Sequence, residues 1–174
     1  MDQLSYQLGQ IDGQLIAFAK LNGKVNHEYD FSLTPLPAGT NAEQAMQQCL
    51  LPDYDDATFA YQPQPDWQAE LSKQVNDWLF SFQPQFDDAE QALRGGCGSS
   101  FACLKDVDAS FILSRPEART ELVQQLMQQI DAAIKVKRLT SVVMDSAHWY
   151  EACWNDFVIE GEYATLLLHL GVSD

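Results

Sequence analysis

The chain has 174 residues, 46% of them hydrophobic, and a formal net charge of −15. This length suits one domain, residues 1–174, and this hydrophobic content supports a sizeable core and argues against global disorder. No apolar run is long enough for a membrane span, and no basic residue precedes an apolar segment at the N-terminus as in a signal peptide. The lack of a signal-peptide pattern predicts a cytoplasmic protein. The acidic charge repels nucleic acid and anionic lipid, so we expect the protein to bind neither.

Alternating apolar residues predict a three-stranded antiparallel meander in 3–34, with strands at 4–10, 14–21 and 25–33. Asn22-Gly23, flanked by these patterns, is a strong hairpin signal because both residues accept positive φ. A rival interpretation makes 4–21 a helix, but the two glycines inside it count against a helix.

Two helices are predicted in the next part of the chain, at 41–51 and 66–82. Thr40 and Glu43 have the spacing of a capping box at the start of the first helix. The acidic loop between the helices is predicted to contain a short strand at 58–61.

Three carboxylates of this loop, Asp53, Asp55 and Asp56, are candidate contacts for a basic partner. They resemble a calcium loop only loosely, because the glycine and the distal glutamate of an EF-hand are missing. A solvated acidic loop is the alternative.

The segment from Ser114 to Lys137 is the clearest helix, since its aliphatic residues recur every four positions. Ser114 and Glu117 have capping-box spacing at its start. Strands predicted at 109–113 and 138–144 flank this helix, and such an order is compatible with a right-handed βαβ crossover.

The aromatic residues near the C-terminus predict a short helix at 148–156, followed by a hairpin with strands at 157–160 and 163–170. A helix this short in a small domain is not expected to bury its two aromatic faces at the same time, so one of them should be exposed. Trp149, Tyr150 and Trp154, surrounded by Glu151 and Asp156, therefore have the composition of an interface hot spot. Aromatic residues that cap the core are the alternative.

A glycine cluster, Gly95 to Ser100, is the main candidate for chemistry, although it matches neither the P-loop nor the dinucleotide pattern. Cys97 to Phe101 reads C-G-S-S-F, which resembles over five residues the C-G-[SA]-C-[WY] segment of papain-like cysteine peptidases. This chain has Ser100 where that family has its nucleophilic cysteine. The resemblance implies Cys97 or Ser100 as the nucleophile, with His148 or His169 as the base.

The cysteine and histidine spacings predict no metal site, and no cofactor is expected. The four cysteines are Cys49, Cys97, Cys103 and Cys153, and without an export signal we expect free thiols. His27 and His169 lie in apolar strand patterns, where a half-buried imidazole with satisfied hydrogen bonds is the common case.

Together these patterns predict an α+β domain with an antiparallel or mixed sheet and about three helices. Residues 26–93 contain twelve acids and one base. This acidic stretch, with the aromatic residues in 149–157, favours a protein that binds and inhibits a basic partner, in the manner of an immunity protein. The alternatives are a hydrolase that uses the 95–100 loop and a chaperone or adaptor of a secreted protein.

Overall fold

A five-stranded antiparallel sheet joins the two halves of the chain. The computed structural model describes residues 2–23, 28–80 and 116–173. The strand order is β1-β5-β4-β3-β2, so the first strand in the sequence lies at one edge and the second lies at the other. The strands are β1 Glu28–Leu36, β2 Thr58–Gln64, β3 Val136–Asp145, β4 Cys153–Gly161 and β5 Thr165–Ser173.

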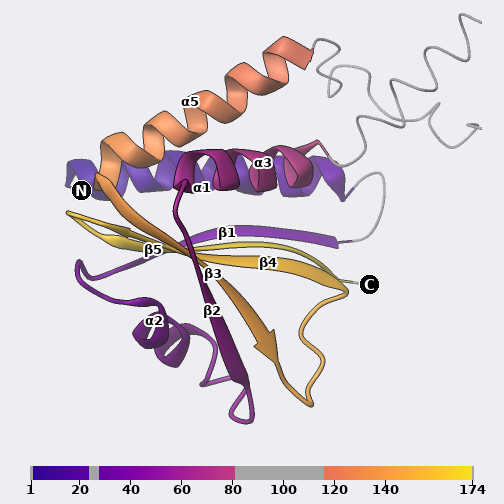
Figure 1. Ribbon diagram of the computed structural model, residues 1–174. Helices are drawn as coiled ribbons and strands as arrows, with labels where there is room; N and C mark the ends of the chain where they lie inside the picture. Colours follow the sequence, from indigo (N-terminus) through magenta and orange to yellow (C-terminus); the bar gives the residue numbers. More distant parts are fainter. Residues whose placement is uncertain (1, 24–27, 81–115, 174) are drawn as a thin grey trace, which may run out of the picture.

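The helices cover the two faces of this sheet unequally. They are α1 Gln3–Asn22, α2 Ala42–Cys49, α3 Trp67–Leu79 and α5 Pro116–Ile134. The three longer helices lie on one face, and the short α2 lies on the other (Figure 1). The predicted α+β class is therefore confirmed, with an antiparallel sheet and four helices in the described part of the chain. None of the described helices is both long and apolar enough to cross a membrane.

The main core lies between the sheet and the three longer helices, which we call the helix face. Alternate strand residues point into this core, among them Phe31, Phe157 and Leu168. Helix α5 contributes Leu126 and Ile130, each at most 2% exposed. The burial of each such side chain stabilises the fold by about 1.5–3 kcal/mol.

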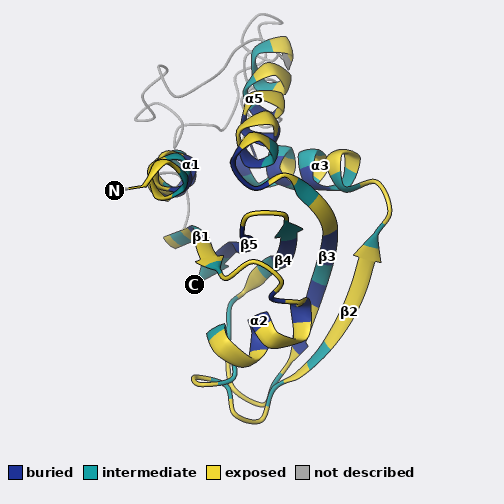
Figure 2. Ribbon diagram, turned by 90° about the vertical axis from the view of Figure 1, so that its left-hand side faces the viewer, coloured by how far each residue is buried: buried dark blue, intermediate teal, exposed yellow. Residues whose placement is uncertain are grey.

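A smaller core lies on the opposite face, which we call the α2 face. Met46 and Leu50, from α2 and its C-cap, pack there against Val142, Val158 and Leu167 of the sheet. An eight-residue helix covers only part of a five-stranded sheet. Figure 2 shows buried strand positions next to α2 and exposed positions along β2. The rest of the α2 face is therefore left for polar side chains.

The predicted N-terminal meander is wrong in its first two strands, because residues 3–22 form α1. The buried residues Leu8, Ile11, Leu15 and Ala19 follow the three- and four-residue spacing of a helix packed on one face. A Cβ on Gly9 or Gly13 would meet nothing, so these glycines weaken the helix without a steric role. The burial of the apolar stripe outweighs that cost. The predicted third strand is present as β1.

The Asn22-Gly23 pair ends α1 instead of forming a hairpin turn. The Gly23 N–H donates to the carbonyl oxygens of Ala19 and Leu21. The side chain of Asn22 is fully buried, and its Nδ2 donates to the Trp78 carbonyl oxygen of α3 at 3.0 Å. The same dipeptide thus serves as a helix terminus that is tied to a second helix.

Smaller corrections concern helix ends. The capping box of α2 is formed by Asn41 and Gln44, one position after the predicted pair Thr40 and Glu43. Helix α5 ends at Ile134 and not at Lys137, because Lys135 adopts φ 55° and β3 begins at Val136.

The predicted helix at 148–156 is also wrong. Residues 148–152 have no regular structure, and Cys153 begins β4. The aromatic spacing by itself is compatible with a helix. The hydrogen-bonded pairing of β4 with β5, however, begins at Cys153, so residues 153–156 belong to the sheet. The predicted hairpin is confirmed and is longer than expected.

The two helices predicted at 41–51 and 66–82 and the strand at 58–61 are confirmed as α2, α3 and β2. Phe82, Ser114 and the predicted strand 109–113 lie outside the described residues, so the capping box at Ser114 and the βαβ crossover stay predictions.

Both edge strands limit further strand pairing. On β1, the Leu33 N–H donates to Oδ1 of Asp12 in α1 at 2.9 Å, and Pro35 has no N–H. On β2, Pro63 likewise has no N–H. Proline and a covering helix are common means of protecting a sheet edge.

We predict that Asp12→Ala lowers the free energy of unfolding by about 1–3 kcal/mol, because the partly buried Leu33 N–H loses its acceptor. Urea denaturation measures this change. Asp77→Ala, at an exposed position of α3, is the control and is expected to change stability by less than about 0.5 kcal/mol. Equal effects of the two substitutions would contradict a specific role for Asp12.

Candidate functional site

A cavity of about 300 Å³ lies on the α2 face, beside the C-terminal end of α2. Strand β1, strands β4 and β5, the loop after α2 and the loop before β4 all contribute to its walls. Its charged and aromatic lining residues are Asp30, Tyr54, Tyr150, Glu151, Asp156 and His169. This cavity is the strongest candidate site in the described part of the chain because it gathers titratable side chains from distant segments.

The sheet register places His169 at the centre of this site. On β5, His169 lies opposite Asp156 of β4 on one side and opposite Ser32 of β1 on the other. Directly opposed residues have Cβ atoms about 4.5–5.5 Å apart, so their side chains can interact. Asp156 and His169 are neighbours for this reason, although the hairpin separates them by thirteen residues.

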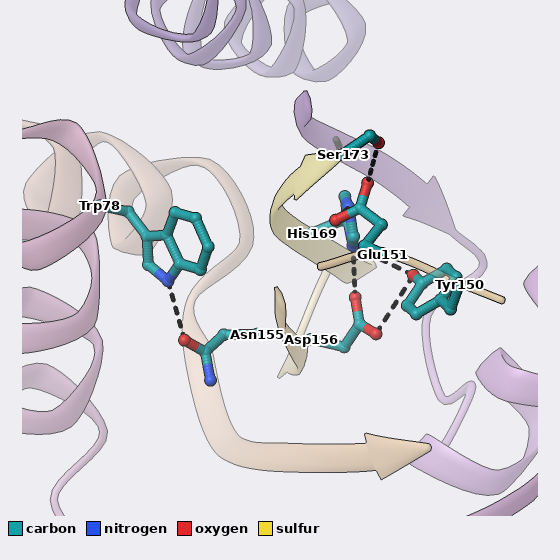
Figure 3. A network of polar contacts seen from close by, with 7 residues as sticks. All are labelled: Trp78, Tyr150, Glu151, Asn155, Asp156, His169 and Ser173. Atoms are coloured by element: carbon teal, nitrogen blue, oxygen red, sulfur yellow. Dashed lines mark hydrogen bonds and ion pairs between the residues drawn. The ribbon is translucent and has the colours of Figure 1, made fainter. Parts of the chain in front are cut away.

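The imidazole of His169 lies between two carboxylates (Figure 3). Its Nδ1 is 2.7 Å from Oδ1 of Asp156, and its Nε2 is 3.4 Å from Oε2 of Glu151. Burial by itself lowers the pKa of His169, but the hydrogen bonds and charges of Asp156 and Glu151 outweigh burial and raise it to about 10. His169 is therefore an imidazolium at neutral pH and donates from both ring nitrogens.

Tyr150 completes the hydrogen-bond network. Its hydroxyl donates to Oδ2 of Asp156 at 3.3 Å and lies 3.1 Å from Nδ1 of His169. Burial, followed by the charges of Asp156 and Glu151, raises the pKa of Tyr150, so its hydroxyl stays neutral. Tyr150 thus acts as a donor that holds the Asp156 carboxylate in position.

Glu151 reaches the site because Gly171 leaves room for its carboxylate. A Cβ added to Gly171 would collide with Oε2 of Glu151 and would lie 2.6 Å from Nε2 of His169. The other carboxylate oxygen, Oε1, accepts from the Ser173 hydroxyl at 3.5 Å. Oε2 is buried, and its contact among the described residues is the long ion pair with Nε2 of His169 at 3.4 Å. The side chain of Glu151 is only 8% exposed.

The charges of the site do not balance. Asp30, Glu151 and Asp156 supply three carboxylates, and His169 supplies the single cation. None of the described residues lining the cavity is Lys or Arg. Negative charge in a partly desolvated cavity attracts a cation more strongly than the same charge in open solvent.

The structure brings the two predicted contact segments together. Asp56 accepts hydrogen bonds from the Ser146 hydroxyl and the Ala147 N–H, both at 2.7 Å. The rings of Tyr54 and Tyr150 pack edge to face with centroids 5.2 Å apart. The acidic loop 53–56 therefore lies against the segment before β4, although about ninety residues separate them in the sequence.

The individual predicted residues have different environments. Trp149 is 67% exposed, and Asp53 and Asp55 are also exposed. Trp154 is half-buried and packs edge to face on Tyr150 with centroids 5.2 Å apart. Glu151 and Asp156 are not the surface charges expected around the aromatic residues, because the sheet buries them against His169.

The ligand atoms of Asp55, Asp56 and His148 lie within 4.8 Å of one another in an exposed group. Both carboxylate oxygens of Asp56 already accept hydrogen bonds from Ser146 and Ala147. These contacts account for the position of Asp56 without an ion.

The predicted hydrolase site is only partly described. The segment 95–100, with Cys97 and Ser100, lies outside the described residues, as does His27. His169 already carries a proton at neutral pH, and a general base must be able to accept one. His148 is exposed beside Asp56. Cys49 and Cys153 are free thiols, and burial raises the pKa of Cys49, which disfavours a reactive thiolate.

Asp30, Tyr54 and the pairing of His169 were not predicted. A histidine within the apolar run 166–170 must have a polar partner, which is a usable signal. A hairpin turning at 162–163 places Asp156 opposite His169, as observed. Asp30 and Tyr54 enter the site through the position of β1 and the loop after α2, for which the sequence has no local signal.

Comparison of the chain with known protein families, with curated proteins and with solved structures gives no match. The site therefore has to be interpreted from its own geometry.

We predict that His169→Gln lowers the free energy of unfolding by about 3–5 kcal/mol, because two buried carboxylates lose their cation. Urea denaturation near neutral pH measures the loss. His148→Gln is the matched control, with an exposed imidazole and an expected change below about 0.5 kcal/mol. If both variants were equally stable, the buried ion pairs would contribute no net stability.

Stability is also predicted to fall at alkaline pH. The pKa of His169 is raised from 6.5 to about 10, so its contribution is fully present below pH 6.5 and is lost as pH rises through 10. The groups facing this imidazole are Asp156 on β4 and Glu151 and Tyr150 in the preceding loop. Denaturation of the wild type and of His169→Gln across this range should show their stability difference shrinking, and a constant difference would contradict the assignment.

Proposed function

We propose that this protein binds a basic protein partner through the α2 face and thereby inhibits or neutralises it. The observation that carries the proposal is the cavity beside α2, where three carboxylates face a single imidazolium and the described lining contains no Lys or Arg. A basic side chain of a partner would supply the missing positive charge. Water can solvate an exposed carboxylate, but it cannot fully solvate one as buried as Glu151.

The surroundings of the cavity support a protein partner. Tyr54 and Tyr150 line the cavity and pack edge to face, and Trp154 packs edge to face on Tyr150. Trp149 extends into solvent, and large exposed aromatic side chains are the usual anchors of protein interfaces. Asp53 and Asp55 are exposed on either side of Tyr54 in the sequence, and exposed charge accelerates association more than it adds affinity.

The charge of the whole chain acts in the same direction. A net charge of −15 produces a long-range field that steers a basic protein toward the acidic surface. We also propose that the protein works in the cytoplasm, where a reducing environment would keep thiols such as Cys49 and Cys153 free.

We predict that the partner, captured from a lysate of the source organism, is retained at low salt and released at high salt. Its association rate constant should fall as ionic strength rises, because salt screens the steering field. Stopped-flow or surface-plasmon measurements on the isolated pair give this rate. Association that is independent of salt would contradict the proposal.

Trp149→Ala tests the segment beside the cavity, because Trp149 directly precedes Tyr150 of the cavity lining. This residue is 67% exposed, so its loss should leave stability unchanged. We expect at least a tenfold loss of affinity, the usual effect of truncating an interface anchor. Trp154 is less suitable because its packing on Tyr150 couples affinity to stability. Tyr163→Ala, at a 52% exposed aromatic residue in the β4–β5 turn, is the control. Equal losses for the two variants would place the interface elsewhere.

A further inference from the structure

Two carboxylates, from Asp30 and Glu151, occupy neighbouring positions on the α2 face. Asp30 of β1 lies opposite Gly171 of β5, which lies opposite Trp154 of β4. The carboxylate of Glu151 fills the space that a side chain at Gly171 would take. Because adjacent strands lie about 4.8 Å apart, Asp30 projects from the position next to this carboxylate.

The imidazolium of His169, the cation already present in the site, makes its shortest contact with Asp156 and not with Asp30 or Glu151. His169 donates its Nδ1 proton to Asp156 at 2.7 Å and contacts Glu151 through Nε2 at 3.4 Å. The buried Oε2 of Glu151 has only this long contact with His169 among the described residues, and the Glu151 side chain lines the cavity while more than nine-tenths buried. Asp156 and Glu151 therefore share this one cation, and a second cation in the cavity would offset the charge of Asp30.

Aromatic rings supply another part of the wall. Tyr54 and Tyr150 both line the cavity, and Tyr150 also contacts Trp154. A guanidinium group stacks on aromatic faces and presents its donors in a planar fork that matches carboxylates. An ammonium group is a compact, strongly hydrated charge that loses more on leaving water.

We propose that this cavity is a receptor for one arginine side chain of the partner, whose guanidinium group binds between Asp30 and Glu151 against the ring of Tyr54 or Tyr150. The inference rests on the proposed function, since it names the residue of the basic partner that this face receives. Its test needs no partner, however, so the two proposals can fail separately.

The test is a ¹H–¹⁵N NMR titration of the full chain with arginine blocked at both ends as N-acetyl-arginine methylamide. Saturable shifts are expected in β1, in 150–156 and in 169–173. The lysine analogue should bind at least fivefold more weakly, because its ammonium group lacks the fork and the stacking plane. The citrulline analogue, which has nearly the same shape but no charge, should not bind measurably.

Two variants locate the guanidinium group. Asp30→Asn removes an exposed charge and should leave the fold intact while weakening arginine binding at least fivefold. Glu151→Gln should weaken arginine binding similarly. If Glu151→Gln is too unstable to measure, the Asp30→Asn result alone tests the proposal. Asp77→Asn, on α3 across the sheet, is the control and should bind arginine as the wild type does.

The inference is overturned if citrulline binds as well as arginine, if Asp30→Asn and Asp77→Asn behave alike, or if the shifts map to the loop 53–56 alone. Arginine binding with no salt-sensitive partner would instead overturn the proposed function while leaving the cavity a guanidinium receptor. If a salt-sensitive partner binds Asp30→Asn as tightly as the wild type, the proposed function is supported and the arginine receptor is contradicted.

Discussion

A buried histidine held between two carboxylates is the constraint on which the α2 face depends. Ionised groups are tolerated inside a protein when each has a partner at short range, and the pairing of His169 with Asp156 and Glu151 meets this condition. The pairing also determines nearby structure. Position 171 must be glycine to admit the Glu151 carboxylate, and the segment before β4 must fold back over the sheet to deliver it.

The unequal covering of the sheet explains why the site lies where it does. Three helices and the apolar residues of every second strand position fill the helix face. The short α2 fills only one part of the opposite face. Beside Val158 and Leu167, which pack on α2, the sheet has Asp30, Asp156 and His169, and Tyr54 and Tyr150 form part of the cavity wall. A charged recess beside a hydrophobic patch is suited to an amphipathic side chain such as arginine, whose stem and head need different surroundings.

Local patterns in the sequence were ambiguous at two places, for related reasons. Residues 3–22 contain short alternations that fit strands, yet Leu8, Ile11 and Leu15 form a helical stripe that only a long window shows. Residues 148–156 have aromatic residues at helical spacing, yet cross-strand pairing with β5 extends β4 to Cys153. Tertiary packing decided both cases. The free energy gained by burying an apolar stripe or by extending a sheet is larger than the free-energy differences in intrinsic helix and strand propensity.

The sequence by itself determined the α+β class, α2, α3, most of α5 and the C-terminal hairpin, since each has a regular apolar period and a recognisable start or end. It also determined the acidic charge, which depends on composition alone. Only the tertiary structure decided that Asp30 and Tyr54 meet Glu151 and His169, because these residues come from four segments and the contact depends on strand order. Strand order is a global property of the packed chain. The cavity and its unbalanced charge therefore have no counterpart in any local motif.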